Sequence, residues 1–242
     1  MNNLKYLQRF FILLFVGFAL CVLQACGDDE ENEPIQEPNE EEVVTPEKPA
    51  DTMEAVDLGL SVKWATCNVG ASKPEEYGGY YAWGETEEKS DYNLETYKWG
   101  NGTDFFMTKY CTNSNHGIVD NKIVLDPEDD VAHVKWGGSW RMPTISEFKE
   151  LIDNCTLEWT TYNGVNGQLV TGPNGNSIFL PAAGFRDGTL LDGSSAIGQY
   201  RSATLDDGPS SESCIVIFHE GYNSWTPYGT RTRGDSVRPV TD

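Results

Sequence analysis

The clearest structural signal in the chain lies in the stretch Trp136-Gly137-Gly138-Ser139-Trp140-Arg141-Met142-Pro143-Thr144-Ile145-Ser146-Glu147-Phe148-Lys149-Glu150-Leu151. Thr144 and Glu147 match a capping box, in which each side chain bonds a backbone N–H that the first helical turn leaves unpaired. Phe148 and Leu151 follow at helical spacing and give one face of the helix an apolar surface. We therefore expect a helix that begins after Thr144 and packs against a sheet.

Composition excludes some classes of partner. The chain has 242 residues, a formal net charge of −21 and an isoelectric point near 4.3. Nucleic-acid binding requires clustered Lys and Arg, so this charge argues against nucleic acid and against electrostatic docking on an anionic membrane. The acidity is uneven, because residues 28–54 carry many Asp and Glu side chains and Lys48 as their only base.

The N-terminus has the pattern of an export signal. Lys5 and Arg9 precede an almost wholly apolar run at residues 10–23, which is shorter than the ~20 residues of a membrane-spanning helix. The run ends in Leu23-Gln24-Ala25-Cys26, which resembles the lipobox of bacterial lipoproteins. We predict that residues 1–25 are removed and that Cys26 carries acyl chains such as palmitate, which anchor the protein in the membrane.

Residues 26–54 are predicted to form the lipidated Cys26 and an acidic, disordered stalk, because they contain few large apolar side chains and several prolines. Residues 27–31 resemble the signal that sends lipoproteins of Bacteroidetes to the outer face of the outer membrane, although a simple acidic tether is the alternative. Thr52 lies in a short acceptor pattern for O-glycosylation and is a candidate modification site.

Residues 55–242 are expected to form one α+β domain. Asn163-Gly164, Asn166-Gly167 and Asn174-Gly175 are predicted turns between short strands, and residues 86–122 are predicted to be a long ordered loop. The strands are expected at residues 56–66 (as two short pieces), 157–161, 168–171, 177–180, 213–219 and 236–240, with the last strand near the first.

A second helix is expected after Asp126-Pro127-Glu128-Asp129-Asp130, with Asp126 as its N-cap and Pro127 in its first position. The same acids could bind calcium, which prefers several carboxylate ligands. Capping explains these residue types more simply, so no metal site and no cofactor are predicted.

Four cysteines remain in the expected domain: Cys67, Cys111, Cys155 and Cys214. Outside the cytoplasm they can form two disulfides in three connectivities, of which Cys67–Cys111 with Cys155–Cys214 is the most local; thiols are the alternative. The sequence lacks the common motifs of hydrolases, and His116, His133 and His219 are scattered. We therefore do not expect an enzyme.

Several motifs, in order from Val56 to Val240, resemble the Fibrobacter succinogenes major paralogous domain, which is abundant in lipoproteins of Bacteroidetes. The resemblance implies a C-type-lectin-like fold, related to that of formylglycine-generating oxidases, and no general biochemical activity. The motifs are Val56-Asp57-Leu58-Gly59-Leu60, Trp64-Ala65-Thr66-Cys67-Asn68-Val69-Gly70-Ala71, Tyr81-Ala82-Trp83-Gly84-Glu85, Thr108-Lys109-Tyr110-Cys111, Trp140-Arg141-Met142-Pro143-Thr144, the run from Gly175 to Arg186, and Ser236-Val237-Arg238-Pro239-Val240.

The chain departs from that family near its C-terminal end. It has Tyr200-Arg201-Ser202-Ala203 where the family usually has Tyr-Trp-Ser-Ser. In lectin-like domains this region often forms the ligand surface, and Tyr, Trp and Arg are favoured at binding hot spots. The candidate contact residues are Arg201, Tyr222, Asn223, Trp225, Tyr228, Arg231 and Arg233, with ordinary loop and strand residues as the alternative reading.

These observations favour a lipoprotein of the outer membrane surface whose domain binds a glycan or a protein without catalysis. One alternative is a structural or accessory role in a surface assembly such as a fimbria. The other is an oxidase of the formylglycine-generating type, which is weakened because those enzymes use paired cysteines and Cys214 has no close partner in the sequence.

Overall fold

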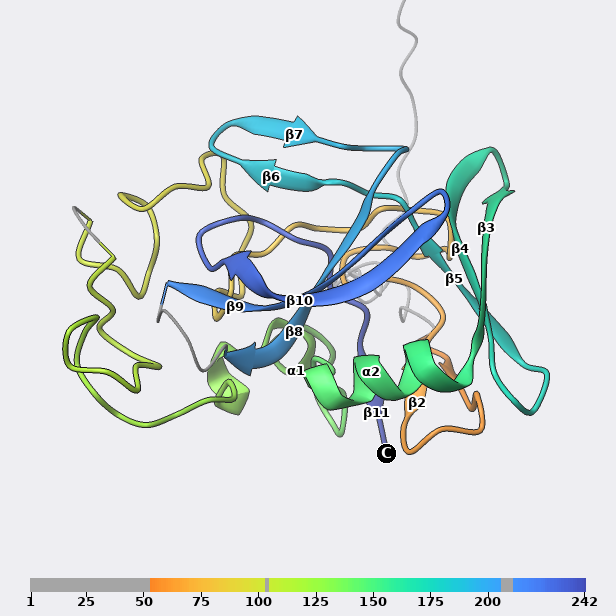
Figure 1. Cartoon of the computed structure of the whole chain (residues 1–242), viewed down its shortest axis with the longest axis horizontal. Helices are drawn as coiled ribbons and strands as arrows, with labels where there is room; N and C mark the ends of the chain where they lie inside the picture. The colour runs from red at the N-terminus through yellow and green to blue at the C-terminus, as the bar shows by residue number, and fades with distance from the viewer. Residues whose placement is uncertain (1–52, 103–104, 206–210) are drawn as a thin grey trace, which may run out of the picture. The chain divides into compact units, whose positions relative to one another are not determined.

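A computed structural model describes residues 53–102, 105–205 and 211–242. Within these residues the domain is α+β, with two α-helices and mostly antiparallel strands, as the sequence predicts (Figure 1). The elements are β1 (Ala55–Val56), β2 (Lys63–Ala65), the 3-10 helix η1 (Pro127–Asp129), α1 (Val131–Trp136), α2 (Ile145–Asn154), β3 (Thr156–Tyr162), β4 (Val165–Thr171), β5 (Ser177–Pro181), β6 (Phe185–Asp187), β7 (Leu190–Asp192), β8 (Gly198–Leu205), β9 (Glu212–His219), β10 (Tyr222–Thr230) and β11 (Val240–Thr241).

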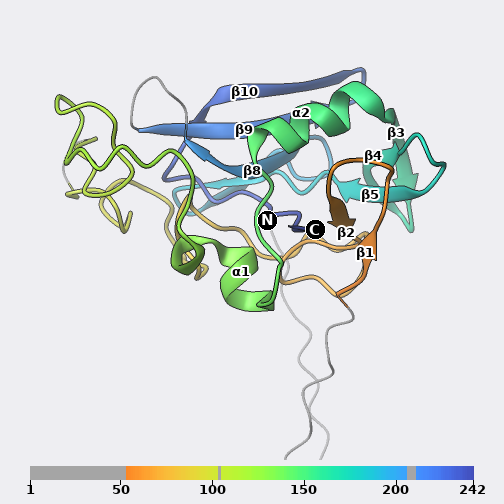
Figure 2. The ribbon, with the colours of Figure 1, turned by 90° about the horizontal axis from the view of Figure 1, so that it is seen from below.

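Helix α2 lies across the three-stranded sheet β10-β9-β8, as Figures 1 and 2 show. The capping box of Thr144 and Glu147 is present, so the predicted start of this helix is confirmed. The helix buries Ile145, Phe148 and Leu151, and the Phe148 ring lies 5.2 Å from the Trp64 ring. The main core therefore forms between α2 and the strands around it.

Two further antiparallel sheets, with strand orders β3-β4-β5 and β1-β2-β11, contain most of the predicted strands. Asn163 and Gly164 make the expected two-residue turn, with φ values of 48° and 83°. The turn predicted at Asn166-Gly167 is wrong, because both residues pair with β3 inside β4. The last strand is Val240–Thr241 rather than the predicted 236–240, and it pairs with β2, so the expected closeness of the two ends of the domain is confirmed.

The start of α1 differs from the prediction. Asp126 precedes η1 without capping it, and α1 begins only at Val131. Asp130 is the N-cap of α1, because its Oδ1 accepts from the backbone N–H groups of Ala132 and His133. The 3-10 helix η1 followed by the α-helix α1 thus replaces the single helix that the sequence predicts.

Residues 86–122 contain no helix or named strand within their described part, in agreement with the predicted loop. Arg231, which is fully buried, fixes this loop to the end of the chain. Its guanidinium donates to the carbonyl oxygens of Lys109 and Tyr110, both at 3.2 Å, and to the Tyr97 hydroxyl at 3.1 Å. The long loop is therefore held by polar contacts rather than by a sheet.

Candidate functional site

A pocket of about 350 Å³ opens next to the stretch that decides the fold. After α1 the chain reverses at Gly137 and Gly138, whose φ values of 70° and 59° favour glycine. It then runs antiparallel to the C-terminal end, where Arg141 pairs with Val240, before α2 begins. This reversal forms one wall of the pocket.

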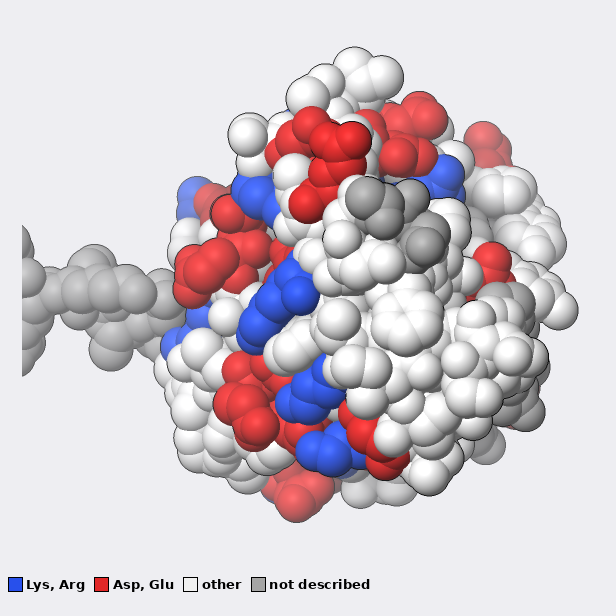
Figure 3. All heavy atoms as spheres, turned by 90° about the vertical axis from the view of Figure 1, so that its left-hand side faces the viewer, with Lys and Arg blue, Asp and Glu red and all other residues white. Residues whose placement is uncertain are grey.

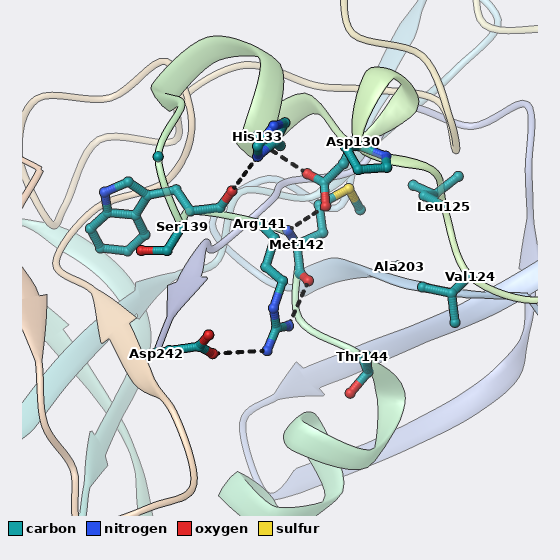
Figure 4. A pocket seen from close by; sticks show the side chains of 13 residues that line it. Val124, Leu125, Asp130, His133, Ser139, Arg141, Met142, Thr144, Ala203 and Asp242 are labelled. Atoms are coloured by element: carbon teal, nitrogen blue, oxygen red, sulfur yellow. Dashed lines mark hydrogen bonds and ion pairs between the residues drawn. The ribbon is translucent and has the colours of Figure 1, made fainter.

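Residues between Val124 and Thr144, together with Ala203 and Asp242, line the pocket, and Figure 4 labels most of them. The volume lies at the lower end of the roughly 300–1,000 Å³ range of ligand pockets. The lining residues are Val124, Leu125, Pro127, Asp130, His133, Gly138, Ser139, Trp140, Arg141, Met142, Thr144, Ala203 and Asp242.

Asp130 is the innermost charged group, with 5% of its surface exposed. Besides capping α1, its Oδ2 accepts from the backbone N–H of Met142 at 2.8 Å. Burial raises the pKa of the Asp130 carboxyl, although the three backbone N–H groups favour its charged form. Asp130 therefore joins the two segments that form the pocket wall and places a carboxylate beside the cavity.

Arg141 is held at the pocket by Glu147 of α2. Its two terminal nitrogens donate to the two carboxylate oxygens of Glu147 at 2.9 and 2.6 Å. The Asp242 carboxylate lies 3.8 Å from the same guanidinium and its side chain is 84% exposed. This fork-to-fork geometry fixes the arginine and largely neutralises its charge.

The rest of the lining is mainly apolar. Trp140 is half-buried and contacts Trp136 edge-to-face, with 5.1 Å between the ring centroids. Met142 and Leu125 are buried, whereas Val124 is 42% exposed at the rim. The backbone carbonyl of Trp140 lies 3.3 Å from Nδ1 of His133. The pocket thus combines an aromatic ring and aliphatic walls with a few fixed polar groups, a combination that suits ligand binding.

The structure places two of the predicted contact residues in the interior. Arg201 and Arg231 are both fully buried, so the expectation that they contact a ligand at the surface is wrong. Arg201 forms a buried ion pair with Asp235 and donates to the carbonyls of Thr230 and Arg233, both at 3.1 Å. A buried guanidinium is costly unless carbonyls and carboxylates compensate it, and both arginines have such partners, although the Nε of Arg201 has none.

Four other predicted contact residues are exposed or half-exposed on or near β10. Tyr222 is 47% exposed and stacks on His219 at 4.9 Å, and Tyr228 is 68% exposed. Asn223 is exposed, and Arg233 pairs with Asp187 at 2.7 Å. The Trp225 side chain lies outside the described part of the structure, and none of the six described side chains lines the pocket.

The acids at Asp126, Glu128 and Asp129 do lie close enough together to hold a metal ion. Lys109 already supplies a positive charge there, with its Nζ 2.7 Å from Asp126 and 2.6 Å from Asp129. Burial alone would raise the pKa of Asp129, but hydrogen bonds from Lys109, Tyr110 and Lys98 outweigh burial and lower it. Figure 3 shows the end of the domain formed by the long loop, where basic and acidic side chains alternate beside a broad uncharged surface.

Within the described residues, the four cysteines of the domain do not form the two expected disulfides with one another. Cys67 donates to the carbonyl of Ala71 at 3.3 Å, and Cys111 donates to that of Asn113 at 3.1 Å. Cys214 is buried in the main core, and the half-buried Cys155 packs against that core. Local turns and the core therefore accommodate these four side chains.

The predictions for the signal peptide, the lipid attachment at Cys26, the stalk and the glycosylation candidate Thr52 lie outside the described residues. Within the described part, none of the helices has the length and apolar character needed to cross a membrane. Comparisons with known protein families, with curated proteins and with solved structures gave no match.

Proposed function

We propose that this protein is a lipid-anchored lipoprotein of the outer membrane that presents a non-catalytic binding domain at the cell surface. The anchor rests on the order of apolar run, small residue and Cys26 in the sequence. The C-type-lectin-like assignment of the domain rests on its sequence motifs. The proposed ligand is a glycan or a protein.

The observation that carries the binding function is the pocket at Trp140. Each ionisable side chain that lines its inner wall is engaged within the fold: Asp130 with backbone N–H groups, Arg141 with Glu147, and His133 with a carbonyl. A catalytic acid or base must be able to exchange a proton with a substrate, and these contacts favour fixed recognition groups instead. An open pocket with an aromatic wall and pre-positioned polar groups supports binding.

Binding is tested with the lipid-free chain of residues 27–242 on glycan and protein arrays. Trp140→Ala should abolish a specific signal, because the half-buried Trp140 is the aromatic residue of the pocket lining. Tyr228→Ala is the matched control, since this exposed aromatic side chain lies on β10. A signal that depends on Tyr228 and not on Trp140 would move the binding site to β10.

The anchor is tested separately by Cys26→Ser, with Cys21→Ser in the same apolar run as its control. The first variant should leave the outer-membrane fraction and the second should stay there. Protease treatment of intact cells then distinguishes the outer from the inner face of that membrane. Retention of the Cys26→Ser protein would refute lipid anchoring.

A role in a surface assembly is the second candidate, because the long loop exposes large apolar side chains. Phe105, Phe106, Ile118 and Val119 are between 39% and 58% exposed, and a bridge between Met107 and Gly117 brings their two segments together. Clustered exposed apolar residues often mark protein contacts. Co-purification of a fixed set of partners that is lost in Ile118→Asp would support this role.

A further inference from the structure

The charge balance of the pocket points to the kind of ligand that it binds, on the basis of the binding function proposed above. Asp130 is almost completely buried, and no Lys or Arg in the described residues forms an ion pair with it. A buried carboxylate is costly unless a positive charge or sufficient hydrogen bonds compensate it. Its three backbone donors leave the negative charge itself in place beside the cavity.

Arg141 interacts electrostatically with Asp130 without forming an ion pair with it, so it offsets this negative charge only in part. Arg141 faces the pocket but is matched by the bidentate contact with Glu147. The Asp242 carboxylate adds a second negative charge at the rim, 3.8 Å from the same arginine, while Lys63 bonds the main-chain oxygen of Asp242 at 3.1 Å. The carboxylates at the pocket therefore outnumber the cations, because Arg141 and Lys63 are the two cations beside the three carboxylates of Asp130, Glu147 and Asp242. The whole chain also carries a net charge of −21.

The walls between these carboxylates suit a long aliphatic stem. Trp140, Met142 and Leu125 provide the apolar lining, and a tryptophan ring also attracts cations at its face. In Figure 4, Asp130 and Asp242 lie on different sides of the pocket, with Val124 and Leu125 opposite Asp242. A ligand with a positive head and an aliphatic stem can satisfy both kinds of surface at once.

We propose that this pocket binds the side chain of an arginine or lysine that a partner protein presents. A protein is favoured over a small free cation because the pocket rim continues into exposed apolar side chains. Ile123 and Val124 are 52% and 42% exposed, and they can contact the residues that flank the inserted side chain. The acidic charge of the chain would also steer a basic partner toward it.

The test uses isothermal titration calorimetry with the lipid-free chain of residues 27–242 and capped Gly-X-Gly peptides, in which X is arginine, norleucine or glutamate. The arginine peptide should bind about tenfold more tightly than the norleucine peptide, as expected for a charge-assisted contact. Its affinity should fall at high salt, and the glutamate peptide should show no binding.

Variants of Asp130 and Asp242 test whether these carboxylates cause the preference for the arginine peptide over the norleucine peptide. Asp130→Asn keeps an N-cap side chain and should remove most of the preference for arginine over norleucine. Asp242→Asn, at an exposed position, should reduce the preference about threefold. Asp153→Asn, an exposed acid on α2 outside the pocket, should leave it unchanged.

The outcomes separate this inference from the binding function. Equal affinities for the arginine and norleucine peptides, or an unchanged preference in folded Asp130→Asn and Asp242→Asn proteins, would overturn the cationic ligand. If no peptide binds while an array ligand still depends on Trp140, the binding function stands and this inference fails. If neither peptide nor array ligand depends on Trp140, the pocket has no role in binding and both fail.

Discussion

Gln168 offers a sharp test of how the core is built. Its side chain is 1% exposed, and neither its amide oxygen nor its amide nitrogen has a hydrogen-bond partner. It borders a small hollow between α2 and the sheets, lined by apolar side chains such as Phe148, Leu151 and Val170. A polar group in this position destabilises the folded state, so replacing it by methionine, which has a similar shape, should be stabilising.

The size of the effect follows from the cost of burying an unsatisfied amide, about 1–3 kcal/mol in protein mutational data. Gln168→Met should raise the free energy of unfolding by about that amount, because the thioether fills the same space without polar groups to satisfy. For a domain of this size each kcal/mol shifts the melting temperature by about 2–4 °C. A rise of roughly 2–12 °C in the melting temperature is therefore expected.

Gln199→Met is the matched control, because Gln199 is 3% exposed but donates to Asp235 at 2.7 Å. The same substitution there removes a hydrogen bond to a buried carboxylate and should cost about 1.5–3 kcal/mol. Urea unfolding followed by circular dichroism gives both values. If Gln168→Met destabilises the protein as much as Gln199→Met does, the account of Gln168 as an unsatisfied core residue is refuted.

Three further predictions test the fold. Arg231→Met should cost about 3 kcal/mol or more and increase hydrogen exchange in the long loop, whereas Arg233→Met at a half-exposed ion pair should cost less than about 1 kcal/mol. Thr144→Ala should cost about 1 kcal/mol in urea unfolding, because it removes the capping box. Burial raises the pKa of Asp235 to about 6, against the charge of Arg201. The stability that the protonated Asp235 carboxyl contributes is thus fully present below the unfolded pKa of about 4 and is lost as the pH rises through about 6. Urea unfolding at a series of pH values should show the free energy of unfolding falling over this range. A constant free energy of unfolding would contradict the raised pKa.

The parts of the fold that the sequence predicted are those with local causes. The capping box at Thr144 and the turn at Asn163-Gly164 depend on residues within a few positions of one another, and both are present. Asn166-Gly167 has the same residue types as that turn but lies within β4. Pairing of β4 with β3 on one side and with β5 on the other outweighs the local preference of these residues for a turn.

Strand β8 was not predicted from the sequence, because its composition hides its burial. β8 contains Gln199, Arg201 and Ser202, all of which are buried, so the alternation of polar and apolar residues is lost. The polar side chains are inside because partners distant in the chain satisfy them, as Asp235 does for Gln199. The pocket is equally non-local, since Ala203 and Asp242 join residues 124–144 only in the folded chain.

The buried arginines show why residue type alone does not identify a contact surface. A guanidinium has five donors in a fixed plane, which suits a hot spot in an interface and suits equally a junction where several loop carbonyls converge. Arg238, also fully buried, donates to the carbonyls of Ala65, Thr66 and Phe179 at 2.8–3.0 Å. A domain with short strands and long loops leaves many carbonyls without a ladder partner, so it needs such donors inside. The arginines near the C-terminal end are therefore required by the loops that they hold. The proposed recognition site is instead the pocket at Trp140, where the buried Asp130 carboxylate accepts from backbone N–H groups and forms no ion pair among the described residues.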